Sequence, residues 1–457
     1  VEHYQQNLTG SDYTKVDTED LTGKTDANAE VTLKNYTGFE TGTYTPATIA
    51  ADGSTVVKVY YDRKVFNVNL GKDAHINSVT INGETATTGS FRYGTTVTID
   101  ASAATGYDFA YWLNNADNTQ VSLGTSQYTI AAIDSNIDYS ATSKPATNTA
   151  YTVKHVRQNV DGTWPTTGDL VQIEAKTGTT GEQTNAQPKS EDINTEYKGF
   201  KAQSYLQSTI AADGTTEVTI KYERQSYQLT LTNDGHFTEL KVNGTTYTDP
   251  VTLKFDEAFT ISATPKAGYS FASWSVAGMS KGTDASLSAN MPYADITYYA
   301  QATPNTNTAY TVKHYQQKLD GTYPTDPTDT DNLTGTTDTQ TSASAKSYEG
   351  FTAVTSGEKA WSQKNIDGDG YTVVEIYYTR NKYNLNLQKD ANIASVTGAA
   401  SDILYGASVT IVATPAAGYN FKNWTDNATG SQVNTDAGTA APATYTFTMP
   451  AKDLTYK

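Results

Sequence analysis

The strongest constraint on this chain is an internal three-fold repeat. The segment VEHYQQN at residues 1–7 returns as VKHVRQN at 153–159 and as VKHYQQK at 312–318. A second marker, Gly-Tyr-x-Phe-x-x-Trp, begins at Gly106, at Gly268 and again at Gly418. Because both markers return in the same order, the chain holds three copies of one unit.

Each unit divides into two small modules, which we call A and B. In module A, the residues after an Asp-Gly turn alternate, so that Val57, Val59 and Tyr61 share one face. In module B, Asn82-Gly83 and Asn243-Gly244 lie between apolar runs. Period-two alternation indicates half-buried strands, and Asn-Gly indicates tight hairpins.

The repeat therefore predicts six modules in alternating order. Their expected bounds are 1–63 (A1), 64–143 (B1), 150–225 (A2), 226–302 (B2), 309–381 (A3) and 382–457 (B3). Residues 141–150 and 301–309 are rich in Pro, Thr and Asn, and we interpret them as semi-stiff linkers from B to A. The link from A to B at 62–65 is short enough to fix the angle between modules.

The predicted fold class is mainly β. We expect an elongated tandem array of small β-grasp-like or β-sandwich-like modules with little helix, the one candidate being a short helix over 27–33. The chain of 457 residues has no cysteine and a net charge of −17. These values exclude a disulfide framework and argue against binding to nucleic acid or to an anionic membrane.

Two family resemblances cover nearly the whole chain. Module A carries Thr22-Gly23, then Gly38-Phe39, then a strand ending in Tyr61, and it resembles mucin-binding-protein (MucBP-like) repeats. Module B carries YGASVTI at 405–411, the Gly-Tyr-x-Phe-x-x-Trp marker and YTFTMP at 445–450, and it looks like the divergent internalin-B-type bacterial repeat. The resemblance implies β-grasp-like modules on a surface protein of Gram-positive-like bacteria. It does not establish mucin binding.

Recurring histidines are the first candidates for chemistry. His3, His155 and His314 share strand faces with valines, and no carboxylate recurs at a fixed short spacing beside them. A metal site needs three or four converging ligands, so we favour partly buried structural histidines. His75 and His236 recur in module B, and we assign them a surface hydrogen-bonding role. We expect no cofactor and no metal.

Three other kinds of chemistry find weak support. The acidic runs at 326–332 and 367–370 could hold calcium, but neither matches a complete calcium-binding loop. No Gly-x-Ser-x-Gly element is present, and small modules offer shallow surfaces, so we expect no enzyme. No lysine, acid and asparagine recur together in all three copies, which argues against Lys–Asn crosslinks.

Aromatic side chains give the best candidates for ligand binding. Tyr60 and Tyr377 lie on the variable face of the module A strand, whereas Trp164 and Trp361 belong to no repeat position that we recognise. Aromatic faces can stack on sugars or anchor protein contacts. The alternative is that these rings protect strand edges or pack against a neighbouring module.

The resulting functional hypothesis is mechanical. We expect a stalk segment of an extracellular bacterial adhesin that projects a distal binding region. The regions that attach it to the cell wall, and any signal peptide, are expected to lie outside this segment. Six modules of about 30 Å would span roughly 180 Å. The alternatives are multivalent binding of host mucin or another glycoprotein, and self-association in a biofilm.

Overall fold

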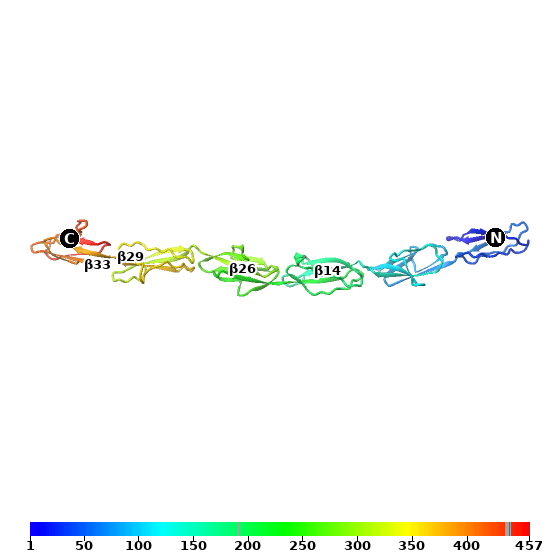
Figure 1. Cartoon of the computed structure of the whole chain (residues 1–457), viewed down its shortest axis with the longest axis horizontal. Helices are drawn as coiled ribbons and strands as arrows, with labels where there is room; N and C mark the ends of the chain where they lie inside the picture. The colour runs from blue at the N-terminus through cyan, green and yellow to red at the C-terminus, as the bar shows by residue number, and fades with distance from the viewer. Residues whose placement is uncertain (191, 193, 435–437, 439) are drawn as a thin grey trace. The chain divides into compact units, whose positions relative to one another are not determined.

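The structure, a computed structural model, describes every residue except 191, 193, 435–437 and 439. It is mainly β, as predicted, and several small sheets form the repeated modules (Figure 1). Among the described residues, the one helical element is the 3-10 turn η1 (Thr195–Tyr197). The helix expected over 27–33 is absent, because the N–H of Ala29 and the carbonyl of Ala27 bind the facing segment at Ala47 and Ile49.

The chain separates into two compact units, residues 1–225 and 226–457, which are described individually. The first unit holds A1, B1 and A2, and the second holds B2, A3 and B3. In Figure 1 the first unit runs from blue to green, and the second runs from green to red.

Every A module is built on one four-stranded sheet. The sheet orders are β2-β1-β4-β3 in A1, β15-β14-β17-β16 in A2 and β28-β27-β30-β29 in A3. The strands of A1 are β1 (Glu2–Gln6), β2 (Tyr13–Thr18), β3 (Thr43–Tyr44) and β4 (Lys58–Tyr61). Those of A2 are β14 (Thr149–Arg157), β15 (Val171–Gly178), β16 (Phe200–Ala202) and β17 (Glu217–Arg224). Those of A3 are β27 (Thr308–Gln316), β28 (Asp329–Gly335), β29 (Phe351–Ala353) and β30 (Thr372–Arg380).

The two central strands of each A sheet run parallel, and a long crossover joins them, which in A2 contains η1. In β4, Val59 and Tyr61 are fully buried while Lys58 and Tyr60 are exposed, as the alternation predicted. The β-grasp likeness stays a prediction, since no helix crosses these sheets within the described residues.

Modules B1 and B2 each consist of two packed sheets. In B1 the orders are β11-β10-β13-β5-β8 and β12-β9-β6-β7, and in B2 they are β21-β18-β26-β23-β24 and β20-β19-β22-β25. The strands of B1 are β5 (Val65–Lys72), β6 (Ile76–Ile81), β7 (Glu84–Thr85), β8 (Thr88–Arg92), β9 (Val97–Ala103), β10 (Tyr107–Asn114), β11 (Gln120–Val121), β12 (Tyr128–Ile130) and β13 (Ile137–Pro145). Those of B2 are β18 (Ser226–Asn233), β19 (Phe237–Val242), β20 (Thr245–Thr246), β21 (Val251–Lys254), β22 (Ala258–Pro265), β23 (Tyr269–Val276), β24 (Met279–Gly282), β25 (Ser286–Asn290) and β26 (Ile296–Pro304).

Module B3 has two three-stranded sheets, β33-β31-β36 and β32-β34-β35. Its strands are β31 (Lys382–Leu387), β32 (Ile393–Thr397), β33 (Ala400–Leu404), β34 (Ser408–Pro415), β35 (Ala443–Thr448) and β36 (Leu454–Tyr456). In all three B modules the Trp of the repeat marker (Trp112, Trp274 or Trp424) lies in the core, at 0 to 1% exposure. The predicted Asn-Gly hairpins are confirmed, with φ of 49° at Asn82 and 51° at Asn243.

The linkers expected between B and A are not linkers. The final strand of B1, β13, runs to Pro145, and the first strand of A2, β14, begins at Thr149. The second copy is the same, with β26 ending at Pro304 and β27 beginning at Thr308. Only three residues separate the strands in each case, because the Thr-rich and Asn-rich runs are themselves in strands.

Candidate functional site

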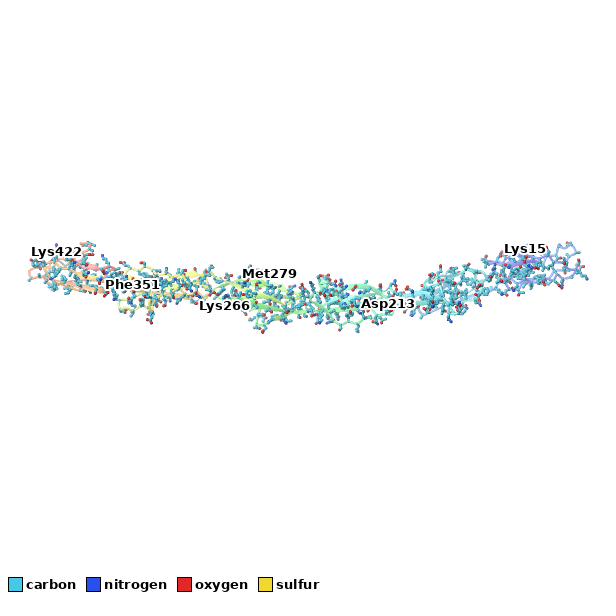
Figure 2. All side chains as sticks on the ribbon, viewed as in Figure 1. Lys15, Asp213, Lys266, Met279, Phe351 and Lys422 are labelled. Atoms are coloured by element: carbon cyan, nitrogen blue, oxygen red, sulfur yellow. The ribbon has the colours of Figure 1, made fainter. Side chains whose placement is uncertain are left out.

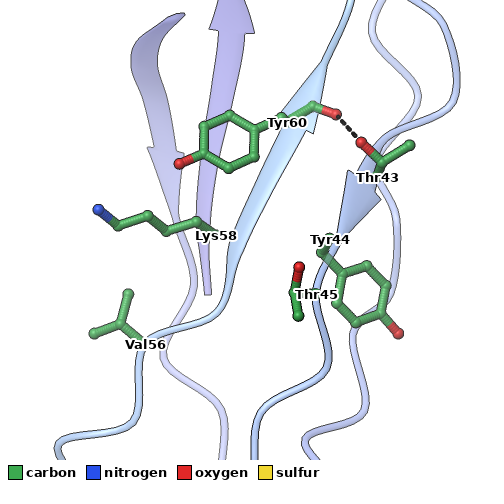
Figure 3. A pocket seen from close by; sticks show the side chains of 6 residues that line it. All are labelled: Thr43, Tyr44, Thr45, Val56, Lys58 and Tyr60. Atoms are coloured by element: carbon green, nitrogen blue, oxygen red, sulfur yellow. Dashed lines mark hydrogen bonds between the residues drawn. The ribbon is translucent and has the colours of Figure 1, made fainter.

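An outward aromatic cluster lies on the face of the A1 sheet opposite the core. Tyr4 and Tyr60 are cross-strand neighbours with ring centroids 5.4 Å apart, and Tyr13 meets Tyr60 edge-on at 5.0 Å. Tyr60 is 37% exposed and adjoins a shallow hollow. Figure 3 shows the residues that line this hollow, Thr43, Tyr44, Thr45, Val56, Lys58 and Tyr60. The sequence candidate Tyr60 is thus one member of a group.

The same cluster recurs in A3 around the second candidate, Tyr377. Its ring stacks on Tyr315 at 5.0 Å and meets Tyr323 edge-on at 4.9 Å. The Lys359 ammonium lies 4.6 Å from the Tyr377 ring centroid, so neighbours cover much of the ring. Burial and a hydrogen bond to Glu375 raise the pKa of Tyr377 to about 12, so the phenol stays protonated at neutral pH.

The structure corrects our interpretation of Trp164. This residue follows Asp161-Gly162 just as Tyr323 follows Asp320-Gly321, so it does occupy a repeat position. In A2, Lys221 replaces the central tyrosine, and its ammonium lies 5.1 Å from the Trp164 ring centroid. Each A module therefore presents an aromatic ring at this place. Sequence reasoning missed the equivalence because an indole replaces a phenol within a variable loop.

Trp361 does not belong to this cluster. It is partly buried and packs against the core of A3, whose members include Tyr310, Val312 and Ile376. Three of the four aromatic candidates therefore belong to the outward clusters, Tyr60 and Tyr377 on the central strand and Trp164 beside it, and the fourth does not.

A buried histidine forms a second recurring group, in the core of each A module. His3, His155 and His314 are 0% exposed, so their predicted burial is confirmed and is in fact complete. Each Nδ1 lies 2.7 to 2.9 Å from a tyrosine hydroxyl of the parallel neighbour strand. Each Nε2 lies 3.2 to 3.6 Å from a carboxylate on the antiparallel side. These partners are Tyr61 and Glu19 in A1, Tyr222 and Glu174 in A2, and Tyr378 and Asp331 in A3.

A lysine from the crossover completes each group. Its backbone N–H donates to the same tyrosine hydroxyl at 2.8 to 3.0 Å, and its ammonium binds the same carboxylate. These lysines are Lys34, Lys189 and Lys346. A lysine and an acid thus do recur together, which the sequence did not reveal because the partners lie on three segments.

Two of the carboxylates considered for calcium, both from the run 326–332, are engaged in this group. Asp329 and Asp331 both bind the ammonium of Lys346. Within the described residues, no three His, Asp or Glu side chains gather into a group that could hold a metal ion. In the same part of the chain, no helix is long and apolar enough to cross a membrane.

The buried histidine of A2 predicts a pH dependence of stability. Burial lowers the pKa of His155 below its usual value, although Glu174 opposes this effect. Below about pH 6.5 this histidine is protonated in the unfolded chain but stays largely neutral in the folded module. The unfolded state therefore binds more protons, so acid destabilises A2. We expect the free energy of unfolding to fall by at most about 1.4 kcal/mol per pH unit there. Urea unfolding followed by NMR signals of A2 at pH 7 and pH 5 measures this loss.

The charged groups around His155 set the control. They are Glu174, Lys176 and Lys189, and two phenols, Tyr197 and Tyr222, also face the ring. Burial raises the pKa of Glu174, but the hydrogen bonds from His155 and Lys189 outweigh burial, so the net effect is a lowered pKa. The Glu174 carboxylate therefore loses its contribution to the stability of A2 only at a pH more acidic than the range tested. His155→Gln should flatten the profile between pH 7 and pH 5, and an unchanged slope would contradict our assignment.

The junction from A to B is clamped by an arginine. Arg63 donates from Nε to the carbonyl of Gln6 at 2.7 Å and from Nη1 to the carbonyl of Tyr93 in B1 at 2.9 Å. Its guanidinium also lies 4.8 Å from the ring centroid of Phe39. The ring of Tyr93 covers Gly38, whose φ is +85° and where a Cβ would lie 2.0 Å from that ring. The Gly38-Phe39 motif thus packs at the junction, where Gly38 makes room for Tyr93 and Phe39 contacts Arg63.

The same junction recurs between A3 and B3. Arg380 donates to the carbonyls of Gln317 at 2.6 Å and Tyr405 at 2.8 Å, and its guanidinium lies over Phe351. Phe351 is labelled in Figure 2. Gly350 contacts the ring of Tyr405 as Gly38 contacts Tyr93. The predicted short link from A to B is therefore reinforced by side-chain contacts.

The junction from B to A rests on the glycine of the Gly-Tyr-x-Phe-x-x-Trp marker. The carbonyl of Gly268 accepts hydrogen bonds from the Asn305 N–H at 2.8 Å and from Thr337 Oγ1 at 2.9 Å. A Cβ at Gly268 would lie 2.2 Å from Gly368 of A3, so the two backbones are in contact. Tyr269 donates to Asp338 across the same junction. Gly106 of B1 meets A2 in the same way, through the N–H of Ala146 at 3.0 Å and close contact with Ala212.

The module B histidines support this junction by stacking. His75 lies on Tyr107 with ring centroids 3.9 Å apart, and His236 lies on Tyr269 at 4.3 Å. We predicted a hydrogen-bonding role from the Asn392 replacement in B3, whereas the contact that the structure shows is ring stacking.

The comparisons with known proteins identify the B modules. Residues 76–155, 227–306 and 383–457 match the divergent InlB B-repeat domain, which accounts for just over half of the chain. This chain belongs to that family, which is typical of structural proteins of the bacterial surface. The resemblance of the A modules to MucBP repeats stays a prediction.

Curated proteins and solved structures add little to this assignment. No curated protein matches. The Bacillus anthracis TIE protein is similar at 10% identity and a TM-score of 0.24, with 54% of this chain and 52% of that chain covered. The pilus adhesin SpaC from Lactobacillus rhamnosus GG is similar at 9% identity and a TM-score of 0.18, with 74% and 47% covered. The chain thus spans about half the length of these structures, and such TM-scores do not establish a shared fold.

Proposed function

We propose that this chain is a repetitive stalk segment of an extracellular bacterial adhesin, which projects a distal binding region from the cell wall. The observation that carries this proposal is the set of module junctions. Within each compact unit, neighbouring modules are joined by a few residues, by hydrogen bonds across the junction and by direct packing around a glycine. Such junctions restrict rotation between modules, which is what a spacer requires.

Two further properties suit this role. The family is typical of bacterial surface proteins. The net charge of −17 makes neighbouring stalks repel one another and stay soluble. In this proposal the function comes from length and stiffness, and no reaction is involved.

A distance measurement inside the first compact unit tests the proposal. Because the chain has no cysteine, Thr9→Cys and Thr166→Cys place two spin labels selectively on exposed loops of A1 and A2. We expect one narrow distance distribution near 60 Å, about two module lengths. Electron–electron double resonance measures it.

The width of the distribution decides between the two outcomes. A broad distribution, or a mean distance far below two module lengths, would show that the junctions bend freely and would remove the spacer function. A matched pair of labels within A1, at Thr9 and Ser54, gives the width expected for a single rigid module.

The outward aromatic clusters support a second candidate function, multivalent binding of host mucin glycans or another glycoprotein. Aromatic rings recur at equivalent places in three A modules, and weak sites on one chain gain strength through avidity. A mucin-glycan array should then bind the whole chain. The triple variant Tyr60→Ala, Trp164→Ala, Tyr377→Ala should lose more than about tenfold in apparent affinity, since three hot-spot contacts are removed.

A matched control separates specific binding from general adhesion. Tyr371 is 83% exposed and lies outside the clusters, so Tyr371→Ala should bind as the unaltered chain does. If the unaltered chain binds no glycan on the array, this second function is excluded and the spacer remains.

A further inference from the structure

The outer edge of the A2 sheet is a regular strand with unpaired backbone groups. β15 is the end strand of this sheet, and it pairs with β14 (Figure 1) over eight residue pairs without a bulge. The Arg157 N–H donates to the Leu170 carbonyl at 2.9 Å, and hydrogen-bonded pairs alternate along an antiparallel ladder. Ile173, Ala175 and Thr177 therefore direct their N–H and C=O groups away from β14. Within the described residues these groups form no hydrogen bond.

The side chains of β15 leave this edge unprotected. Ile173 is 63% exposed, and Ala175 and Thr177 are exposed beside it on the outward face of the sheet. The two charged residues of the strand, Glu174 and Lys176, have opposite signs. Natural edge strands are usually blunted by bulges, by proline, by like charges or by a covering segment. A regular edge with an exposed isoleucine is instead a template for another strand.

The equivalent edges of A1 and A3 are blunted. In A1 the ladder skips Val16 of β2, and such a bulge disrupts the edge for a further strand. In A3, β28 carries Asp329 and Asp331, and Leu333 occupies the place that Lys176 has in A2, so this strand has two acids and no base. A2 also has the smallest net charge of the A modules, −2 against −5 in A1 and −4 in A3. Electrostatic repulsion between two copies is therefore weakest at A2.

We propose that β15 pairs with β15 of a second copy of this chain, antiparallel and about a two-fold axis at Ala175. In this register Ile173 lies opposite Thr177 of the second copy. The outward residues of the two strands exchange about six backbone hydrogen bonds, which joins two A2 sheets into one. Glu174 lies opposite Lys176 of the second copy, and the two-fold axis repeats this pair.

Charge selects this register over its neighbours. A shift of the two strands to the next register places Glu174 opposite Glu174 or Lys176 opposite Lys176, and like charges directly opposite destabilise a sheet. The Glu174 carboxylate can also accept a further partner. Its Oε2 lies 3.2 Å from His155 Nε2 and 3.2 Å from Lys189 Nζ, whereas its Oε1 lies 3.5 Å from Lys176 Nζ of the same chain. Oε1 is therefore the atom that meets the ammonium of the second copy.

Sedimentation velocity of the whole chain tests the proposal. The salt concentration is set at about 0.15 M, where repulsion between charges more than about 8 Å apart is screened. We expect a reversible equilibrium between monomer and dimer with a dissociation constant of about 10 to 500 µM. A chain that stays monomeric up to about 1 mM would overturn the proposal. Open assembly into larger species would do the same, because a two-fold edge contact closes at the dimer.

Two variants locate the contact, with one matched control. Ala175→Pro removes the N–H at the two-fold axis, and because that N–H points away from β14, the A2 sheet loses no internal hydrogen bond. NMR signals of A2 should keep their unfolding midpoint, while dimerisation weakens at least about tenfold. Lys176→Glu places like charges opposite one another and should also weaken the dimer. Lys201→Glu makes the same change of net charge on the exposed surface of the opposite edge strand β16, and it should dimerise as the unaltered chain does.

The outcomes of these variants are decisive. Unchanged dimerisation of Ala175→Pro would show that copies meet at another surface. Equal weakening by Lys176→Glu and Lys201→Glu would show that net charge alone controls association. Either result would overturn the pairing of β15 with β15.

Disulfide crosslinking tests the register, since the chain has no cysteine of its own. The two copies of residue 175 form a hydrogen-bonded pair with Cα atoms about 5.5 Å apart, within reach of a disulfide. Ala175→Cys should therefore give covalent dimers with oxidised glutathione. The two copies of residue 177 lie four residues out of register, about 13 Å apart, so Thr177→Cys should stay largely monomeric under the same conditions. Equal crosslinking of the two variants would contradict the two-fold register at Ala175.

Discussion

Replacing Trp274 with alanine is expected to unfold module B2. The indole is 0% exposed, and it packs against Phe271 and Tyr298 with ring centroids 5.7 and 6.3 Å away. Its Nε1–H donates to the carbonyl of Ala285 at 3.3 Å. Removing a buried Trp costs about 3–5 kcal/mol, and a module with one small core and no disulfide has about that much stability in total. NMR signals of B2 during urea unfolding measure the loss.

A second tryptophan of the chain supplies the matched control. Trp164 lies partly exposed in the outward aromatic cluster of A2, so Trp164→Ala should cost at most about 1 kcal/mol. The signals of B1 should keep their midpoint in Trp274→Ala, because B1 has its own separate core. Simultaneous unfolding of B1 and B2 in this variant would show that the modules are not independent folding units.

The strand pattern of these modules could be predicted because it is local. Alternation along 57–61 and its repeats reflects one buried face, and Asn-Gly between apolar runs specifies a two-residue hairpin. Neither inference needs a distant partner.

The failed linker prediction shows the limit of composition. Residues 141–145 look like linker because Thr, Ser, Lys and Pro also favour extended flexible chain. Their actual conformation is decided by β10, which begins more than 30 residues earlier and pairs with them. A strand whose side chains are small and polar carries no alternation that could identify it.

The histidine groups were only half predictable. Burial of His3, His155 and His314 follows from their valine-lined strand face. Their carboxylates lie 16 to 19 residues later, on the neighbouring strand or directly after it, and the spacing varies because the connecting loop varies in length. A search that allowed variable spacing between the repeats would have found the recurring acid and the recurring lysine.

The arginine clamp yields the second large expected effect. Arg380→Ala removes two hydrogen bonds from a charged donor, to the carbonyls of Gln317 and Tyr405, and the contact with Phe351. Only the bond to Tyr405 crosses the junction, and such a bond contributes about 1.5–3 kcal/mol, so the coupling that fixes the relative orientation of A3 and B3 should weaken by about that amount. Residual dipolar couplings of the two modules, which report one shared alignment in the unaltered chain, should separate into two.

A conservative variant distinguishes the clamp from simple packing. Arg380→Lys keeps the charge but cannot reach two carbonyls with a fixed fork, so it should resemble the alanine variant in the dipolar couplings while preserving the fold of both modules. If lysine restores a single alignment, charge alone holds the junction. If Arg380→Ala also leaves a single alignment, the packing of Tyr405 over Gly350 is sufficient to fix the junction. The stiffness of this junction would then depend on the glycine contact, which Gly350→Ala tests directly.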